Sequence, residues 1–502
     1  MIKKKDNKYN SYLFFFFIFC YIFVLNLTQV ITQHWTAILD QDTVMIYNSL
    51  LVINGYDQEF RDHPGYTFLF FLGIVYKICS YFYSNNIFSL DEIIKSTHIV
   101  HYNFQILFYI ARWVNSFVIF LIFIFYYKVS RILKINQKII FLSIIIIITS
   151  NSFFELIFLI RNESFSVLFF LISFFQILKF FEKKRYKYIL YSGFFFTFAM
   201  LAKIQIIILF IIPFLIIPIL IKIKDTKNTL IKFKKLFVIQ NFIFFLFYLF
   251  FQAIIIYSSS ESQRMYFDSI FFITCLILYL FYSKKIIKLE KEELFVLNNI
   301  FAIFSLGAIT LLIILKIIDI FNIVKLSNYV LLRLSNPIHY LTIFSNLNVK
   351  VSFFTKVSGV FKSFYISEII FLIFIIISSI IFLIKFKDKD KYKNALYIIF
   401  LLHIIILICS NFLRKPYFFY TIIMATIFFN IISKNFHNKI IQIVNIFLII
   451  IFLSNTISSK TIYNFFNTQN NSKLICEDSA TRQYMKYYHN KFDENFLNKF
   501  CQ

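Results

Sequence analysis

Long runs of apolar residues, separated by short polar segments, repeat along almost the whole of this 502-residue chain. A helix needs roughly 20 apolar residues to cross a bilayer, and its backbone groups must be paired inside lipid, so each run is expected to be helical. The runs that we interpret as spanning helices lie near residues 12–31, 104–127, 139–157, 165–181, 188–202, 204–221, 236–256, 267–283, 294–317, 365–385, 395–412, 417–432 and 440–457. The pattern predicts an all-α, polytopic integral membrane protein.

One further apolar segment, residues 66–83, affects the predicted number of crossings. A crossing there inverts the side on which every later loop lies. Either this segment is partly re-entrant, or one of the shorter runs, such as 139–157, does not cross. The prediction is therefore about 13 or 14 spanning helices.

The composition supports the membrane interpretation and excludes a nucleic-acid-binding one. Charged residues make up 15% of the chain, against about 25% in a typical soluble domain. The net charge of +26 comes mainly from Lys and Arg in short loops, as the positive-inside rule describes for the cytoplasmic side. These loops are 128–138, 182–187, 222–235, 284–293, 385–394 and 433–439.

The longer polar stretches are expected on the extracytoplasmic face of a cell (inner) membrane. They cover residues 32–65, 84–103, 318–364 and 458–502. The sequence contains no recognisable soluble catalytic domain and no internal repeat. Any chemistry is therefore expected at the membrane surface, where loops and helix ends meet.

The first outer loop, 32–65, has the densest cluster of polar residues. Asp40 and Asp42 are one residue apart, so in an extended segment both carboxylates face the same side. Such a pair suits a general base or a divalent-cation site. Residues 43–54 predict a short helix in the membrane interface, with Gly55 as its C′ residue. The alternative is that Asp42 only caps this helix and Asp40 is solvated.

Isolated charges between apolar runs form a second group of candidates. Arg161 and Glu163 lie two residues apart, and Lys203 is the one charge in residues 188–221. Charges near a bilayer are costly unless they serve a site or lie at its edge. The alternatives are a wetted turn for Arg161 and Glu163, and a snorkelling side chain for Lys203.

Two further cations, Arg264 and Arg414, lie in short turns that the predicted topology assigns to the outside. This position goes against the positive-inside rule. It marks both residues as candidate phosphate binders, and equally as places where the topology can be wrong.

The order of these features is similar to that of a known family. The motifs are Leu39-Asp40-Gln41-Asp42, Asp62-His63-Pro64-Gly65-Tyr66, Arg112 in Ala-Arg-Trp-Val-Asn, Arg161-Asn-Glu163, and Gly193 with Ala199-Met-Leu-Ala-Lys203. Over about residues 1–225, the chain resembles the GT-C superfamily of multi-spanning glycosyltransferases. The bacterial members that it resembles most are related to protein O-mannosyltransferases, aminoarabinose transferases and Rgt-type lipopolysaccharide sugar transferases.

The resemblance implies an inverting glycosyltransferase that uses a polyprenyl-phosphate-linked sugar. An aspartate of the first outer loop is the family's catalytic base or positions the acceptor, which makes Asp40 the first candidate and Asp42 the second. The family often has Asp-Glu followed by Tyr where this chain has Asp-Gln-Asp and Tyr47, so the choice between the carboxylates stays open. His63-Pro64 matches a family motif that leads into the next apolar run and is commonly Lys-Pro-Pro or His-Pro-Pro. Gly65 stands in this chain where that motif has its second proline.

These considerations divide the chain and assign the remaining roles. Residues 1–225 are expected to form the catalytic module, 226–457 further transmembrane helices, and 458–502 an extracytoplasmic tail. Substrate binding is expected of His63, Arg161, Glu163, Lys203, Arg264 and Arg414. The expected acceptor is an envelope glycan, lipid or protein.

Two rival functions differ in where they need polar residues. A transporter or lipid-linked oligosaccharide flippase needs charges or helix breaks near the midplane and often contains repeats. An O-antigen polymerase or ligase usually carries functional arginines in a large late outer loop, and 318–364 contains only Arg333.

Overall fold

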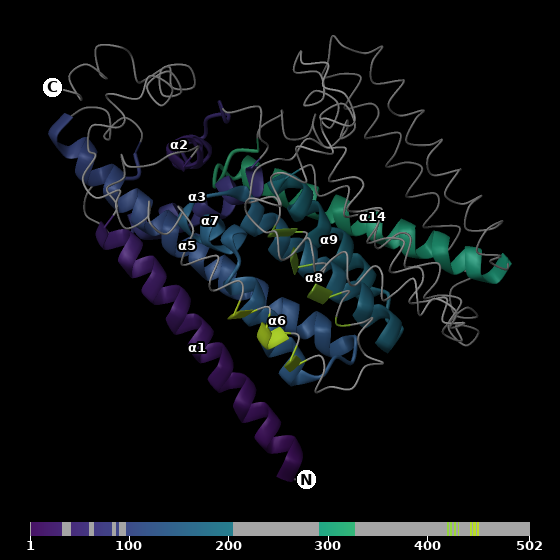
Figure 1. Ribbon diagram of the computed structural model, residues 1–502. Helices are drawn as coiled ribbons and strands as arrows, with labels where there is room; N and C mark the ends of the chain where they lie inside the picture. The colour runs from purple at the N-terminus through teal and green to yellow at the C-terminus, as the bar shows by residue number, and fades with distance from the viewer. Residues whose placement is uncertain are drawn as a thin grey trace, which may run out of the picture.

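The computed structural model of the protein describes residues 2–32, 42–59, 65–82, 87–89, 97–203 and 291–326, with short pieces between 419 and 450 (Figure 1). Within these residues every regular element is a helix. The helices are α1 Ile2–Thr32, α2 Asp42–Ile53, α3 Tyr66–Ser80, α5 Thr97–Ile132, α6 Gln137–Ile148, α7 Asn151–Phe158, α8 Asn162–Lys183, α9 Lys187–Ala202 and α14 Lys291–Ile320. The all-α prediction is confirmed for this part of the chain.

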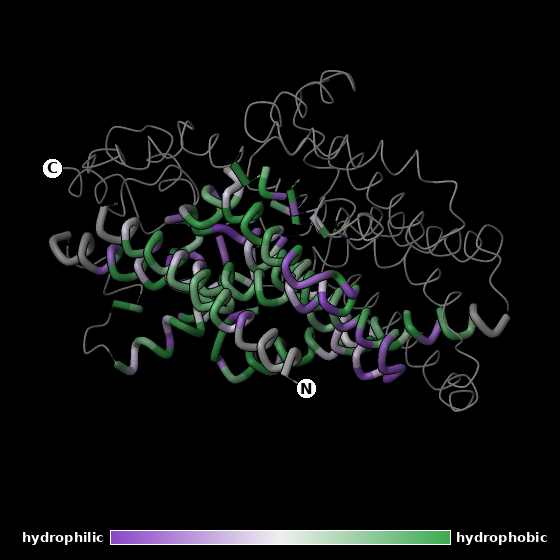
Figure 2. The backbone as a smooth tube through the Cα atoms, turned by 60° about the horizontal axis from the view of Figure 1, so that its bottom comes forward, coloured by the Kyte–Doolittle hydropathy of each residue, from purple (hydrophilic) through white to green (hydrophobic). Residues whose placement is uncertain are grey.

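Four of the described helices are long and apolar enough to cross a membrane. These segments are Asn10–Thr28, Asn103–Ile132, Asn162–Lys183 and Phe295–Ile320. They overlap the runs predicted near 12–31, 104–127, 165–181 and 294–317. Figure 2 shows long hydrophobic stretches in the described helices, interrupted by short hydrophilic ones. The four helices indicate a membrane protein.

Several predicted segments lie outside the described residues. They are the runs near 204–221, 236–256, 267–283, 365–385 and 395–412, and the tail 458–502. The runs near 417–432 and 440–457 are described only in part.

The prediction of one helix over residues 139–157 is wrong, because the chain forms α6 and α7 there with a break at Thr149 and Ser150. The Ser150 hydroxyl donates to the Ile147 carbonyl at 2.7 Å and accepts from the backbone N–H of Phe153 at 3.2 Å. Ser150 therefore caps α7 and satisfies groups that the break would otherwise leave unpaired. The twelve residues of α6 rise only about 18 Å, well short of a bilayer's hydrocarbon core of about 30 Å.

The helix predicted over residues 43–54 is confirmed as α2, but its expected surface position is not. Its side chains from Val44 to Val52 are all buried, whereas an interfacial helix keeps a polar face in water. Its polar residue Asn48 donates back to the Val44 carbonyl at 2.7 Å, which makes burial tolerable. Gly55 ends the helix at φ 81°, as predicted for its C′ residue.

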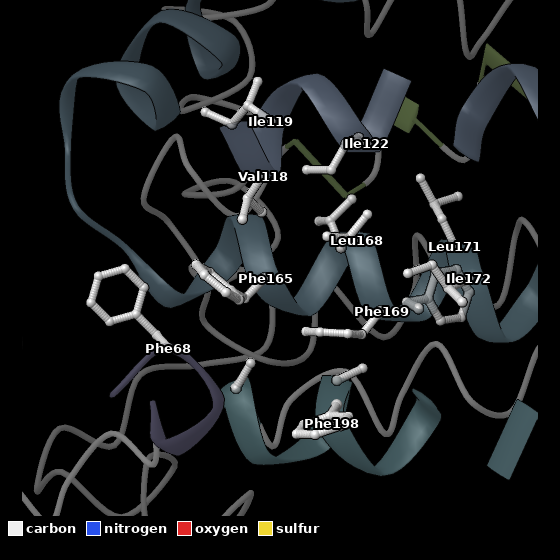
Figure 3. Packing of buried hydrophobic residues seen from close by; sticks show 14 of the residues in the cluster. Phe68, Val118, Ile119, Ile122, Phe165, Leu168, Phe169, Leu171, Ile172 and Phe198 are labelled. Carbon is white, nitrogen blue, oxygen red and sulfur yellow. The ribbon is translucent and has the colours of Figure 1, made fainter. Parts of the chain in front are cut away.

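The core is centred on α8, which lies between α5 and α9 (Figure 3). Helices α8 and α9 form an antiparallel pair through a short turn at residues 184–186. Phe169 of α8 stacks on Phe198 of α9 with ring centroids 5.0 Å apart, while Leu168 faces Val118 and Ile122 of α5 in Figure 3. This packing brings the start of α8 and the end of α9 to the same end of the bundle.

Two glycines allow α9 and α14 to approach closely. A Cβ atom at Gly193 would overlap the backbone of Phe304, and one at Gly307 would overlap the backbone of Leu190. Small residues at such reciprocal positions let two helix backbones pack against each other in a membrane. This contact holds α14 against the α8–α9 pair.

Candidate functional site

A short extended turn between α7 and α8 is the centre of the site. Leu159 and Arg161 both have extended backbone angles, so the backbone hydrogen bonds of α7 do not continue into α8. Asn115 of α5 holds this turn. Its side-chain amide donates to the carbonyls of Leu156 at 2.9 Å and Leu159 at 3.1 Å, and its oxygen accepts from Ser164 at 2.6 Å. The turn is therefore fixed from both sides by one buried amide.

Arg161, Glu163 and Lys203 meet in one ion cluster beside this turn. Lys203 Nζ lies 2.8 Å from Glu163 Oε1, and Arg161 Nη1 lies 3.8 Å from the same oxygen. The Lys203 and Glu163 side chains are only 3% and 2% exposed. Glu163 is in the first turn of α8 and Lys203 follows the end of α9, where each charge complements its helix dipole. The structure thus joins three of the predicted substrate-binding residues.

Asp42 opens α2 and is buried, with 1% of its surface exposed. Neither carboxylate oxygen makes a hydrogen bond of good geometry with the described residues, so Asp42 does not act as a side-chain cap there. Burial raises the pKa of Asp42 from its ordinary 3.8 to about 7, although the nearby backbone N–H of Ile160 and the guanidinium of Arg112 act against this rise. A carboxyl group that titrates near neutral pH is suited to accept and release a proton.

Arg112 of α5 is a functional candidate that the site prediction missed. Its side chain is 1% exposed and lies over the Phe108 ring, 5.7 Å from the centroid. Arg112 is the one charged residue in the predicted span 104–127, and such a charge inside a span is usually functional. That signal was present in the sequence, but nothing in the sequence connected Arg112 with Asp42.

The N-terminus of α3 reaches the same region through Gly65. Gly65 has φ 47°, and a Cβ atom there would fall on the side-chain amide of Asn162 at the start of α8. A proline at this position would be locked near φ −65° and could not adopt this conformation. The Thr67 hydroxyl also donates to the Phe198 carbonyl at 2.6 Å, which ties α3 to the end of α9.

Three helix N-termini therefore converge at the candidate site. Asp42 begins α2 next to Ile160, and Gly65 precedes α3 next to Asn162 of α8. Figure 1 shows α2, α3 and α7 gathered at one end of the bundle. Helix N-termini attract anions through free N–H groups and the helix dipole. Arg112, Arg161 and Lys203 lie at the same end of the described bundle, together with the carboxyl groups of Asp42 and Glu163.

The other predicted site residues cannot be compared with this geometry. Asp40, His63, Arg264 and Arg414 lie outside the described residues. A cation site shared by Asp40 and Asp42 therefore stays a prediction. Within the described part of the chain, no group of three or more His, Cys, Asp or Glu side chains is placed to hold a metal ion.

Comparison with known proteins found no relative of this chain. No family model, no curated protein and no solved structure matches the chain.

Proposed function

We propose that the chain is a membrane glycosyltransferase of the GT-C type, which transfers a sugar from a polyprenyl-phosphate donor to an acceptor with inversion. The observation that carries the proposal is Asp42, a buried carboxyl with a pKa of about 7 that lies close to Arg112 and to Ile160, the residue before Arg161. Such a transfer needs a proton acceptor and a stabilised phosphate leaving group close together.

In the proposed step, Asp42 takes the proton of the acceptor hydroxyl. The hydroxyl oxygen forms a bond to C1 of the sugar, and the bond from C1 to the phosphate oxygen breaks with its electron pair on the phosphate. The carboxylic acid then releases its proton to water. Because Asp42 is almost fully covered, the acceptor must displace neighbouring groups before it reaches the carboxylate.

The phosphate is proposed to bind between the cations and the helix N-termini. The Asp42–Arg112 pair and the ion cluster of Arg161, Glu163 and Lys203 together hold three cations and two carboxylates, a surplus of one positive charge. The converging N-termini of α2, α3 and α8 favour negative charge further. Preorganised donors of this kind stabilise a leaving group without costly rearrangement.

The wider arrangement belongs to the same proposal. The chain is taken to cross an inner membrane about 13 or 14 times, with the Asp42 cluster at the extracytoplasmic face. The polyprenyl tail would lie between helices of the module 1–225. Donor sugars are hexoses or pentoses, and the acceptor is an envelope glycan, lipid or protein.

A transporter or flippase is the second candidate, because one observation favours it. Arg112 is a fully buried charge within a long apolar helix, and such charges often line transport pathways. A transporter would move its substrate without breaking the bond between sugar and phosphate. Release of polyprenyl phosphate therefore distinguishes the two functions.

The test uses membranes that contain the wild-type chain and a panel of radiolabelled polyprenyl-phosphate hexoses and pentoses. We expect one donor to label a membrane acceptor, and Asp42→Asn to reduce the labelling by about 10²- to 10⁴-fold, the usual loss for a general base. Asp57→Asn is the matched control, because Asp57 lies in the same loop and is exposed. Asp40→Asn tests the other carboxylate of the loop.

Two results would contradict the proposal. Absence of transfer by the wild-type chain from every donor of the panel would contradict the activity. Equal transfer by wild type, Asp42→Asn and Asp40→Asn, at equal amounts of inserted protein, would contradict the role of the loop carboxylates.

A further inference from the structure

A second polar region lies where α5 ends and α6 begins, away from the Asp42 cluster. A cavity of about 1070 Å³ opens there, next to α1. Arg131, Lys134 and Lys138 line it together with amide side chains such as Asn10 and Asn136, and none of the described lining residues is acidic. The cavity therefore has the chemical character of an anion site.

The walls of this cavity are fixed by contacts among three helices. Gln137 of α6 donates to the Ser11 hydroxyl of α1 at 2.7 Å, and Ser11 lies 3.0 Å from the Tyr127 hydroxyl of α5. Phe14 and Phe141 stack with centroids 4.0 Å apart. The N-terminus of α6 also faces the cavity, since Gln137 and Lys138 open that helix and line the space. This adds a helix dipole that favours an anion.

The position of the cavity along α5 relates it to a membrane surface. Arg131 follows Arg112 by nineteen residues on one unbroken helix, a rise of about 28 Å. That rise is close to the hydrocarbon thickness of a bilayer, about 30 Å. If the Asp42 cluster is at one face, the cavity is at the level of lipid headgroups on the other. The neighbouring α1 side chains Leu13, Phe16 and Phe17 are 45%, 60% and 62% exposed. Lipid acyl chains can therefore pack against them.

The backbone conformation of Lys134 allows its charge to be removed without disturbing the turn. It ends α5 at φ 60°, and the N–H of Ile135 donates to the Ser130 carbonyl at 3.1 Å, which completes a Schellman ending. Glycine is preferred at this position because a side chain there is strained. A Lys134→Gly variant therefore removes the cation and keeps the turn.

We propose that this cavity binds the phosphate of an anionic phospholipid headgroup, in the leaflet opposite the Asp42 cluster. Arg131, Lys134 and Lys138 supply the positive charge, and the dipole of α6 adds to it at the start of that helix. The lipid's acyl chains lie along the exposed apolar side of α1.

The experiment measures binding of phosphatidylglycerol to the full-length, detergent-solubilised chain by native mass spectrometry. We expect Lys134→Gly and Lys138→Gln each to weaken the apparent dissociation constant roughly five-fold, because a basic residue at a membrane surface contributes about 1 kcal/mol. Lys184→Gly is the matched control: Lys184 ends α8 at φ 53° but does not line the cavity. We expect its binding to equal that of the wild type.

Three outcomes would overturn the proposal. If Lys184→Gly weakened phosphatidylglycerol binding as much as Lys134→Gly, the lipid would be attracted only by the overall charge of the protein. Phosphatidylcholine binding as tightly as phosphatidylglycerol would show that the anionic headgroup is not recognised. Inorganic phosphate displacing the lipid at an equal concentration would make free phosphate the ligand. Thermal unfolding of each variant at or above the wild-type temperature verifies that the fold is intact.

Discussion

Asp42 and Glu163 are two buried carboxyl groups with different surroundings. Glu163 has Lys203 at 2.8 Å and Arg161 at 3.8 Å, whereas Asp42 has no hydrogen bond of good geometry to the described residues. A carboxylate already engaged by two cations is a poor proton acceptor. The environment therefore favours Asp42 for proton transfer and Glu163 for holding the cations in place.

The raised pKa of Asp42 predicts how stability depends on pH. Because the folded-state pKa of about 7 exceeds the ordinary 3.8, the folded chain binds this proton more tightly than the unfolded chain. The resulting stabilisation is complete below pH 3.8 and is lost as the pH rises through 7. We expect the wild type to lose about 2 to 3 kcal/mol between pH 5 and pH 7, and Asp42→Asn to lose much less. Thermal unfolding in detergent at both pH values measures this difference, and parallel curves for the two proteins would contradict it.

The Glu163–Lys203 pair predicts non-additive effects of substitution. Glu163→Gln or Lys203→Met alone leaves a buried charge without its closest partner and is expected to cost about 3 to 5 kcal/mol. The double variant removes both charges and should lose clearly less than the sum of the single variants. Unfolding temperatures of the four proteins measure the coupling, and additive losses would show that the pair contributes no mutual stabilisation. If Lys203 also binds phosphate, sugar transfer stays low in the double variant even where stability recovers.

Among the elements, the positions of the four long apolar helices were predictable, because a long apolar run in a membrane has few alternatives to a helix. The break after α6 was not, because Thr149 and Ser150 can bond to preceding carbonyls within a continuous helix as well as at its end. The burial of α2 was not predictable either, because it depends on the helices that surround α2. The twelve residues of α2 do not by themselves indicate which helices those are.

The candidate site was predictable only in part. Arg161, Glu163 and Lys203 were recognisable as charges among apolar residues, but their contact with one another became visible only in the structure. The role of Asn115 was not recognisable, because a neutral amide gives no sign of partners 41 residues away. The roles of Asp40, His63, Arg264 and Arg414 stay predictions.

The close contact of α9 and α14 predicts sensitivity to small increases in volume. Gly193→Val would push the two backbones apart at Phe304, and we expect a loss of about 1 to 3 kcal/mol or more. Ala308→Val is the control, since Ala308 lies beside Gly307 in α14 but is half-buried. Thermal unfolding compares the variants. Similar losses for both would mean that the glycine contact has no special importance.

For the whole molecule, α5 connects two polar regions of different chemistry. Arg112 belongs to the region with Asp42, and Arg131 lines the basic cavity about 28 Å further along the helix. Under the two proposals above, sugar transfer takes place at the membrane face with Asp42, and the lipid headgroup binds at the opposite face. The module predicted over residues 1–225 carries the charged residues of both regions, while Asn430 and Gln442 of the later part of the chain also line the basic cavity.

The most direct measurement is the pH dependence of polyprenyl phosphate release in membranes that contain the chain, with the donor that the panel identifies. We expect the wild-type rate to rise with pH and to level off above an apparent pKa of about 7, because Asp42 must be deprotonated to accept a proton. Asp42→Asn should release little polyprenyl phosphate at any pH. Release by Asp42→Asn at the wild-type rate and with the wild-type pH profile would contradict the assignment of Asp42 as the base.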